Sequence, residues 1–236
     1  MVTRIKTNGK GLRPVPDFVR VERGEVDAEG APAGPARAAI VIPRPQTASL
    51  KVRIVGDATL VCHHFGAKAR REIREKQARE PGAPTPKKVA RNPDLEYQEA
   101  FYRDAEGRAC IPAAGLREAM ASAYLLLGGA YKRDIYTAIW LEPKLIPILG
   151  GDPTMREDVV RLSGPQRPAD LRYRPGFDSW YADLTIHFDR ARMNAQSAIH
   201  LIESAGLYIG IFEGRREKGG EWGAFHVQSQ PELERA

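Results

Sequence analysis

Five glycines and three cationic side chains lie close together near the end of the chain, in the stretch "GIFEGRREKGGEWGAF" from Gly210 to Phe225. Glycine permits positive φ angles and a close approach of the backbone to a ligand. Arg215, Arg216 and Lys218 place positive charge beside that backbone. The stretch is not a Walker loop. Two interpretations follow: a loop that contacts phosphate, or a hairpin whose glycines serve only the turn.

A second cationic segment runs from Gly66 to Arg91 and holds nine Lys or Arg residues against three Glu. Its excess of positive charge equals that of the whole chain, +6. Such clustering is typical of a surface that binds a polyanion, because each neutralised phosphate releases a condensed counterion. The alternative is a solvated helix with internal ion pairs, such as Glu72 with Lys76. The expected phosphate contacts are Lys68, Arg70, Arg71, Arg74, Lys87, Lys88 and Arg91.

A third group combines arginines with aromatic rings in "MREDVVRLSGPQRPADLRYRPGFDSW". Guanidinium groups bridge phosphates while aromatic faces stack on bases, and this pairing suits single strands without sequence preference. The alternative is that the arginines pair with neighbouring carboxylates. Trp180 is in phase with the core-facing residues of its strand and is expected in the core. The expected ligand contacts in this group are Arg161, Arg172, Tyr173 and Arg174.

His63 and His64 are the residues that invite an enzymatic interpretation. A histidine beside a glycine-rich loop can act as general base on a ribose 2′-hydroxyl. The alternative, which we adopt, is one packed and one exposed imidazole without a catalytic role. No metal site and no cofactor are expected, because no acidic or cysteine pair accompanies the histidines at ligand spacing. Cys62 and Cys110 likewise show no zinc-binding or disulfide spacing.

Length and composition favour a cytoplasmic protein that does not enter a membrane. A chain of 236 residues can bury a core without disulfides or metal. Two cysteines without paired spacing indicate a reducing compartment. No apolar run reaches the ~18 residues that a membrane span needs, and the start "MVTRIKTNGKGLRP" lacks the apolar region of a signal peptide.

The elements that must position these residues follow from hydrophobic periodicity and residue type. Alternating apolar residues predict strands in "SLKVRIVGD", continuing through "ATLVCHHF", and in "WYADLTIHFD". β-Branched and aromatic content predicts further strands in "DIYTAIWLEP", "LIPILGG", "LYIGIFE" and "WGAFHV". Apolar residues three and four positions apart predict helices from Ala113 to Leu127 and from about Asn194 to Gly206. A helix from Ala67 to Arg79 is nearly bare of apolar residues and is expected to project from the core.

Without the insertions, the order is strand, helix, strand, strand, helix, strand. This order predicts an α+β, ferredoxin-like domain, in which an antiparallel sheet carries both helices on one face. The other face is left free, as in RNA-recognition domains that bind single strands there. We expect a single domain over residues 1–236, with an irregular arm at 24–46, a basic insertion at 66–110 and an arginine-rich insertion at 143–179.

Three stretches resemble the repeat-associated (RAMP) superfamily of CRISPR effector proteins. The stretch "RACIPAAGLREAM" resembles the "IPGSSLKGALR" pattern that opens the first helix of these proteins. The stretch "AGLYIGIFEGRREKGGEWGAFHV" resembles their glycine-rich loop and last strand, and "LKVRIVGDATLVCHHFGAKARREI" occupies the place of their first strand. The chain is most similar to the backbone subunit that coats guide RNA. It resembles even more closely small phage-encoded proteins of similar length, with a "HxFxxKAxxExxxKQ" start and a "VRxxxGxxxxRYRPxFxxWxAxLxI" centre.

The resemblance implies a RAMP-type fold and a coat protein that does not cleave nucleic acid. It adds Arg117 to the expected contacts, because Arg117 occupies the place of a lysine in the helix pattern. It also favours phosphate contact at Arg215, Arg216 and Lys218 in the glycine-rich loop. The chain departs from the pattern at Ala113 and Ala114, where hydroxyl side chains are usual, and no target-cleaving aspartate can be placed.

We therefore expect a protein that binds single-stranded DNA or RNA, with copies of itself arranged side by side along the strand. One alternative is a metal-independent endoribonuclease that uses His63 or His64, as in the CRISPR repeat-cleaving enzymes that the chain resembles. A second alternative is an assembly protein without nucleic acid, in which the basic stretch is a partner or solubility face.

Overall fold

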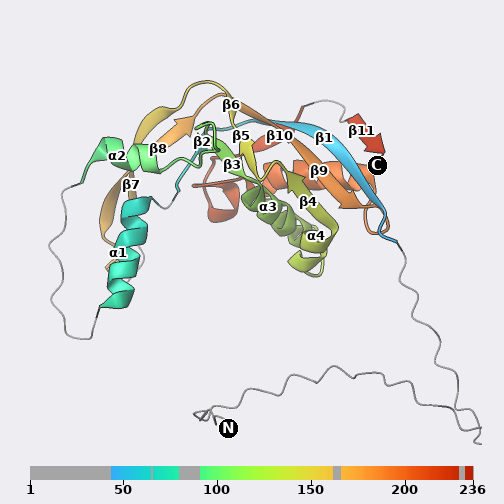
Figure 1. Ribbon diagram of the computed structural model, residues 1–236, viewed down its shortest axis with the longest axis horizontal. Coiled ribbons are helices and arrows are strands. Elements are labelled where there is room, and N and C mark those ends of the chain that lie inside the picture. The colour runs from blue at the N-terminus through green and yellow to red at the C-terminus, as the bar shows by residue number, and fades with distance from the viewer. Residues whose placement is uncertain (1–43, 65, 80–90, 162–165, 229–231, 236) are drawn as a thin grey trace, which may run out of the picture. The chain divides into compact units, whose positions relative to one another are not determined.

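Figure 1 shows the computed structural model, which describes residues 44–64, 66–79, 91–161, 166–228 and 232–235. Residues Arg44–Ala236 form one unit of the chain. The expected arm at 24–46 lies outside the described residues, apart from its last three positions. Lys87 and Lys88 also lie outside them.

The main sheet is built around the strands β1 and β9, which pair with each other over most of their length. Buried residues alternate with less buried ones along both strands, as the sequence pattern predicts; in β1, Leu50, Val52 and Ile54 are buried while Lys51 and Arg53 are exposed. All pairings are antiparallel and the strand order is β10-β1-β9-β4, with β11 beside β1 and β6 beside β9. The strands are β1 Thr47–Gly56, β4 Ile139–Glu142, β6 Leu149–Gly150, β9 Trp180–Asp189, β10 Phe225–Val227 and β11 Glu232–Arg235.

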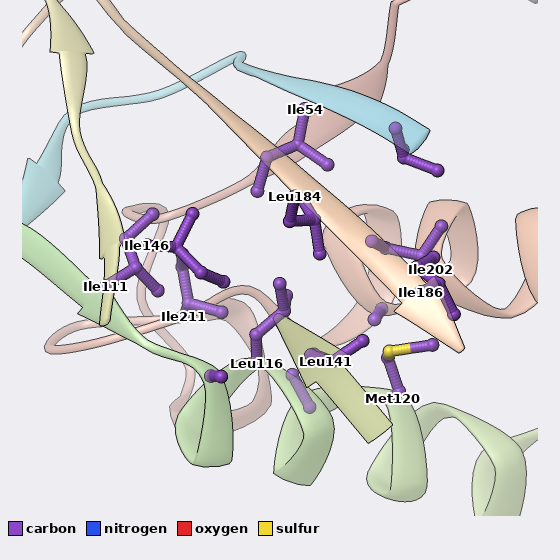
Figure 2. Close-up of a cluster of buried hydrophobic side chains, with 14 of the residues drawn as sticks. Ile54, Ile111, Leu116, Met120, Leu141, Ile146, Leu184, Ile186, Ile202 and Ile211 are labelled. Carbon is purple, nitrogen blue, oxygen red and sulfur yellow. The ribbon is translucent and has the colours of Figure 1, made fainter. Parts of the chain in front are cut away.

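Two helices cover one face of this sheet and contact each other there. Figure 2 shows Leu116 and Met120 of α3 and Ile202 of α5 pointing into the same apolar cluster as Ile54 and Leu184 of the sheet. Each buried Leu or Ile contributes about 1.5–3 kcal/mol, so this cluster fixes the helices on the sheet. The predicted helices and the predicted core face of β9 are confirmed. The bounds are α3 Ala113–Leu126 and α5 Ala195–Ser204.

Two smaller antiparallel sheets accompany the main sheet. One has the order β2-β8-β7 and the other pairs β3 with β5. The sequence pattern predicts no strand in the arginine-rich segment, yet β7 and β8 form a hairpin there (Figure 1). The strands are β2 Leu60–Val61, β3 Cys110–Pro112, β5 Leu145–Pro147, β7 Thr154–Arg161 and β8 Ala169–Phe177.

The strand predicted in "DIYTAIWLEP" is wrong in its first half. These residues finish the helix α4 (Lys132–Ala138), and only Ile139–Glu142 are extended. Helical spacing places Ile135 and Ala138 together in the core, and that burial outweighs the intrinsic strand preference of Ile and Tyr.

The strand predicted in "LYIGIFE" is also wrong. The helix α5 does not end at Gly206 but continues into a π-helical turn, η1 (Ala205–Ile209), which buries Gly206 and Ile209. A Cβ atom at Gly206 would lie 2.0 Å from the carbonyl oxygen of Phe225. The glycine is therefore the point where the turn packs against the last strand, rather than a helix stop.

Three further helical segments lie outside the core. The expected exposed helix from Ala67 is present as α1, and α2 begins at Asn92, whose side chain accepts a hydrogen bond from the backbone amide of Leu95. Among the described residues, no helix is both long and apolar enough to cross a membrane. The bounds are α1 Ala67–Ala78, α2 Pro93–Glu99 and η2, a 3₁₀ turn, Arg216–Lys218.

Candidate nucleic-acid interface

The glycine-rich loop is fastened to the strands around it by backbone hydrogen bonds. The amide of Ile211 donates to the carbonyl of Gly223 at 3.0 Å, which closes the base of the loop. The amide of Glu213 donates to Val61 at 3.2 Å, and the amide of Gly223 donates to Thr59 at 2.9 Å. The loop is therefore a fixed part of the structure beside β2 and not a free hairpin between two strands.

Packing within the loop explains its glycines. A Cβ atom at Gly220 would lie 1.9 Å from the carbonyl oxygen of Gly214, and one at Gly223 would lie 2.0 Å from that of Ile211. The amides of Gly219 and Gly220 donate to carbonyls inside the loop. These two amides are thus already engaged and are not available to a phosphate, whereas the cationic side chains of the loop are.

The carboxylate of Glu118 on α3 joins three segments of the chain. It accepts hydrogen bonds from Lys132 at 2.5 Å and from the hydroxyl of Tyr136, both on α4. Burial alone would raise the pKa of the Glu118 carboxyl, but these hydrogen bonds and the nearby charge of Arg215 hold that pKa below its ordinary value. The pKa of Lys132 is raised by its hydrogen bond to Glu118 and also by the negative charge of Glu217 in the glycine-rich loop. The loop therefore lies near enough to α3 and α4 for its charges to act on Glu118 and Lys132, and η1, which leads into the loop, packs against α3.

Cationic and aromatic side chains lie in this region. The guanidinium of Arg117 lies 5.7 Å from the ring centroid of Tyr136. Arg215 donates to the carboxylate of Glu217 at 3.0 Å, while Arg216 and Lys218 are exposed. We call this region the loop–helix surface, defined by Arg117, Glu118, Lys132, Tyr136, Arg215, Arg216, Glu217 and Lys218.

Four of the residues predicted from the sequence come together on the loop–helix surface, although almost a hundred positions separate α3 from the loop in the chain. They are Arg117, Arg215, Arg216 and Lys218. Lys132 and Tyr136 were missed, because the predicted strand begins at Asp134 and therefore includes Tyr136 but not Lys132, so the two residues are not expected on one element. Their spacing of four positions is helical and is the signal that identifies them as neighbours.

Arg174 corrects the prediction of a phosphate contact in the arginine-rich segment. Its side chain is 4% exposed, and its guanidinium pairs with Asp158 at 2.9 Å and with Glu213 at 3.5 Å. Arg156 pairs with the same Asp158 at 3.2 Å. Both guanidinium groups lie against the ring of Trp222, at 4.7 Å for Arg156 and 5.9 Å for Arg174. Arg174 therefore links the β7–β8 hairpin to the glycine-rich loop and is closed to a ligand.

Two further arginines near this hairpin, Arg172 and Arg91, are held in ion pairs. Arg172 pairs with Asp170 at 3.0 Å, and Arg91 reaches both Asp170 at 2.6 Å and Glu96 at 2.5 Å. Carboxylates thus neutralise this group, as the alternative interpretation of the segment expects. Tyr173 is half-buried on β8, and Arg161 is exposed at the end of β7.

Two cations of the basic segment that have described side chains are exposed on α1, Arg70 and Arg74. The backbone of α1 also includes Lys68 and Arg71. The expected contact of this segment with a polyanion stays a prediction.

The two histidines are both half-buried beside the glycine-rich loop, which differs from the expected pair of one packed and one exposed ring. His63 Nδ1 lies 3.4 Å from the carboxylate of Glu213, and a hydrogen bond from His63 lowers the pKa of that carboxyl. His64 Nε2 lies 3.3 Å from the guanidinium of Arg70, and its Nδ1 lies 3.3 Å from the carbonyl of Glu99. Each imidazole is thus oriented by a partner, an arrangement compatible with structure or with proton transfer.

The cysteines and the acidic residues offer no metal centre in the part of the chain that the structure describes. No group of three or more His, Cys, Asp or Glu side chains is placed to hold an ion there. Both cysteines are buried, and burial raises the pKa of the Cys62 thiol to about 12 and that of Cys110 to about 11. Burial and the raised pKa both disfavour the reactive thiolate form of these cysteines at neutral pH.

Comparisons with known proteins find likeness to solved structures. No protein-family model and no curated protein matches the chain. Its fold is similar to a chain in a cryo-EM structure of the Type III-B Cmr-beta bound to cognate target RNA, at 10% sequence identity and a TM-score of 0.48. The match covers 80% of this chain and 61% of that chain, so the protein spans less than two thirds of its neighbour's length.

Proposed function

We propose that this protein binds single-stranded nucleic acid through the loop–helix surface and does not cleave it. One observation carries the proposal: two segments that resemble separate RAMP motifs, at the start of α3 and in the glycine-rich loop, lie near each other, since η1 before the loop packs against α3 and the charge of Arg215 acts on Glu118. Their cations, Arg117 and Arg215, lie on the same surface as the exposed Arg216 and Lys218.

The chemistry of the loop–helix surface suits a polyanion. Within this surface, the cations are more numerous than the carboxylates, Glu118 and Glu217, and each carboxylate already has a cationic partner. The cations that remain exposed at the rim can neutralise phosphates and release counterions. Tyr136 adds an aromatic ring beside Arg117, on which a base can stack.

The strand order of the main sheet supports the finer interpretation of the fold. In the order of the chain, β1, β4, β9 and β10 are the first to fourth strands of the predicted motif, with α3 and α5 between them. The observed order β10-β1-β9-β4 places the first and third strands in the centre, as a ferredoxin-like sheet requires. We therefore propose a RAMP-type domain with the hairpin β7–β8 as an addition.

A salt titration tests the proposal. The affinity for a single-stranded oligonucleotide is expected to fall as salt rises, and the double variant Arg216→Glu, Lys218→Glu is expected to weaken binding. If each cation contacts one phosphate, the slope of log affinity against log salt falls in magnitude by about 1.4. The control Arg44→Glu, Arg190→Glu makes the same charge change at the other end of β1. Equal losses in both variants would show general attraction rather than a site at the loop.

A second candidate function is metal-independent RNA cleavage, because His63 is oriented by Glu213 beside the glycine-rich loop. A carboxylate that orients an imidazole also stabilises its protonated form after proton abstraction. The test measures cleavage of RNA in EDTA. If the native protein cleaves RNA but not a strand of 2′-deoxynucleotides, and cleavage is lost in His63→Ala or His64→Ala, the protein is an endoribonuclease and our proposal is wrong. The binding protein is expected to show no turnover in this assay.

The third candidate, an assembly protein without nucleic acid, is separated from the other two by the purified protein itself. Absorbance at 260 nm that co-purifies and is removed by RNase or by DNase identifies the bound strand. Absence of such material, together with no affinity for added single strands, would favour the assembly protein.

A further inference from the structure

The face of the main sheet that points away from α3 and α5 carries aromatic rings in a regular arrangement. The core-facing residues of β9 are buried, and the intervening ones, among them Tyr181, Asp183 and His187, lie on the opposite face. Their partners across the sheet include Arg53 on β1 and Trp140 on β4. Polar and aromatic side chains therefore share this face, which we call the open face.

Trp140 and His187 form a stack at one end of the open face. They are direct partners in the β4–β9 register, with ring centroids 5.3 Å apart and ring planes at 5°. His187 Nε2 lies 3.1 Å from the carboxylate of Glu142, which fixes the imidazole. Trp140 nevertheless stays 38% exposed, on the last strand of the sheet order. One face of a large ring is held in place while ring surface remains available to a further planar group.

Tyr181 and Arg53 form a second stack at the other end of the open face. The guanidinium of Arg53 lies 4.5 Å from the ring centroid of Tyr181. Two hydrogen bonds to Asp183, at 2.6 and 2.7 Å, hold the guanidinium in this position. Guanidinium planes and tyrosine rings are both surfaces on which nucleobases stack.

The two stacks lie on one line that starts at the glycine-rich loop. Tyr181 and His187 are six positions apart on β9, which corresponds to about 20 Å along the strand. Tyr181 pairs with Val55, and Val55 also pairs with His226, just after the loop. A nucleic-acid strand whose phosphates are held at the glycine-rich loop can therefore continue past β10 onto the open face.

The charge of the open face favours a neutral planar group. The carboxylates beside the two stacks each face a cationic or imidazole partner: Asp183 contacts Arg53, and Glu142 contacts His187. A phosphate gains little attraction from a surface whose charges are already paired. An unstacked base is uncharged, so it can gain contact with the aromatic rings without needing a free cation. An apolar protein partner is less well matched, because it would bury these ion pairs without replacing their hydration.

We propose that the Trp140–His187 and Tyr181–Arg53 stacks bind bases of the same single strand whose phosphates the loop–helix surface holds. This inference rests on the proposed function. It divides the work between two regions: the loop–helix surface supplies salt-dependent phosphate contact, and the open face supplies salt-independent base contact.

The test compares a probe that has bases with one that lacks them. Affinities for oligouridylate and for inorganic polyphosphate are measured in the native protein, in Trp140→Ala and in Trp140→Phe. We expect Trp140→Ala to weaken oligouridylate binding by about 5- to 100-fold, the range for loss of one base–aromatic stack, and to leave polyphosphate binding unchanged. Trp140→Phe keeps a ring and should retain most of the affinity. The matched control Tyr131→Ala removes another exposed aromatic ring, outside the open face, and should change neither affinity.

The outcomes separate this inference from the proposed function. If Trp140→Ala binds oligouridylate normally while Arg216→Glu, Lys218→Glu does not, base stacking on the open face is wrong and the proposed function stands. Equal losses for both probes in Trp140→Ala would show a general effect of the variant and would also overturn the inference. If the native protein binds neither probe, both proposals fail. Circular dichroism of each variant establishes that it is folded, and Trp140→Phe provides the comparison if Trp140→Ala is not.

Discussion

Among single residues, Arg174 shows most clearly how burial changes the meaning of a charge. An exposed arginine among aromatic residues suits a phosphate, but this guanidinium lies in the interior between Asp158, Glu213 and Trp222. The buried Nε atoms of Arg174 and Arg156 have no hydrogen-bond partner among the described residues. The face of Trp222 offsets part of that cost through cation–π attraction. The residue therefore stabilises the contact between hairpin and loop.

The first prediction concerns this contact. Replacing Arg174 with Met leaves Asp158 and Glu213 without their shared partner, so the free energy of unfolding should fall by about 3 kcal/mol. Replacing Arg172 with Met, on the same strand, removes a partly exposed ion pair with Asp170 and should cost about 1 kcal/mol or less. Urea denaturation of the two variants measures both values. Similar losses in the two variants would contradict a structural role specific to Arg174.

At the scale of elements, the glycine-rich loop answers the question that its sequence raises. Contacts inside the protein require four of its five glycines, all but Gly219, and a 3₁₀ turn, η2, presents Arg216 and Lys218. In this segment the glycines thus determine the conformation of the loop, while Arg216 and Lys218 are the residues available to a ligand. A glycine that served only close approach of a ligand would have open space around it; Gly219 is such a position, whereas Gly223 is not.

The second prediction compares these two glycines. Both have positive φ, 78° for Gly219 and 67° for Gly223, so an alanine is strained by about 1–2 kcal/mol at either position. At Gly223 its Cβ would also lie 2.0 Å from the carbonyl oxygen of Ile211, while at Gly219 nothing lies within 4 Å. Thermal unfolding should therefore show a much larger loss of stability for Gly223→Ala than for Gly219→Ala.

The same pair of variants also reports on binding. If the nucleic acid approaches the protein backbone at the tip of the loop, Gly219→Ala should reduce the affinity for single-stranded nucleic acid by more than its small loss of stability explains. Unchanged affinity in this variant would restrict the contact to the side chains of Arg216 and Lys218.

At the scale of the whole molecule, the proposed binding surfaces are short compared with a long nucleic acid. The open face measures about 20 Å between its stacks, and the loop–helix surface adds a small number of cations. A non-specific binder of this size gains avidity when copies bind side by side along one strand. We therefore propose a coat of identical subunits as the working form of the protein.

The third prediction tests this assembly. Sedimentation velocity with single strands of increasing length should show particles whose mass rises with strand length. Deletion of residues 24–46, the arm expected from the sequence, should reduce this growth more than it reduces affinity for a very short oligonucleotide. Particles that stay at one protein per strand at saturation would refute the coat and leave simple binding intact. Deletion that changes neither property would exclude the arm from the contact between copies.

Local periodicity in the sequence was enough to determine the central elements. Alternation marks β1 and β9 and assigns Trp180 to the core, where its indole donates to the carbonyl of Ala58 at 2.9 Å. The helical spacing in α3 and α5, and Asn194 as the N-cap of α5, are equally visible without coordinates. These signals are reliable because one buried face repeats over many residues and is specified by each of them.

Only the tertiary structure decided the features that depend on distant segments. Ile135 and Ala138 are helical because a helix places both side chains in the core. Gly206 continues a helix because Phe225 packs against it. The contact of Arg174 with Glu213 joins residues 39 positions apart, and the charge of Arg215 acts on Glu118 from almost a hundred positions away in the chain. Side-chain type specifies what each residue can bind, whereas packing of remote elements determines which of those partners is within reach.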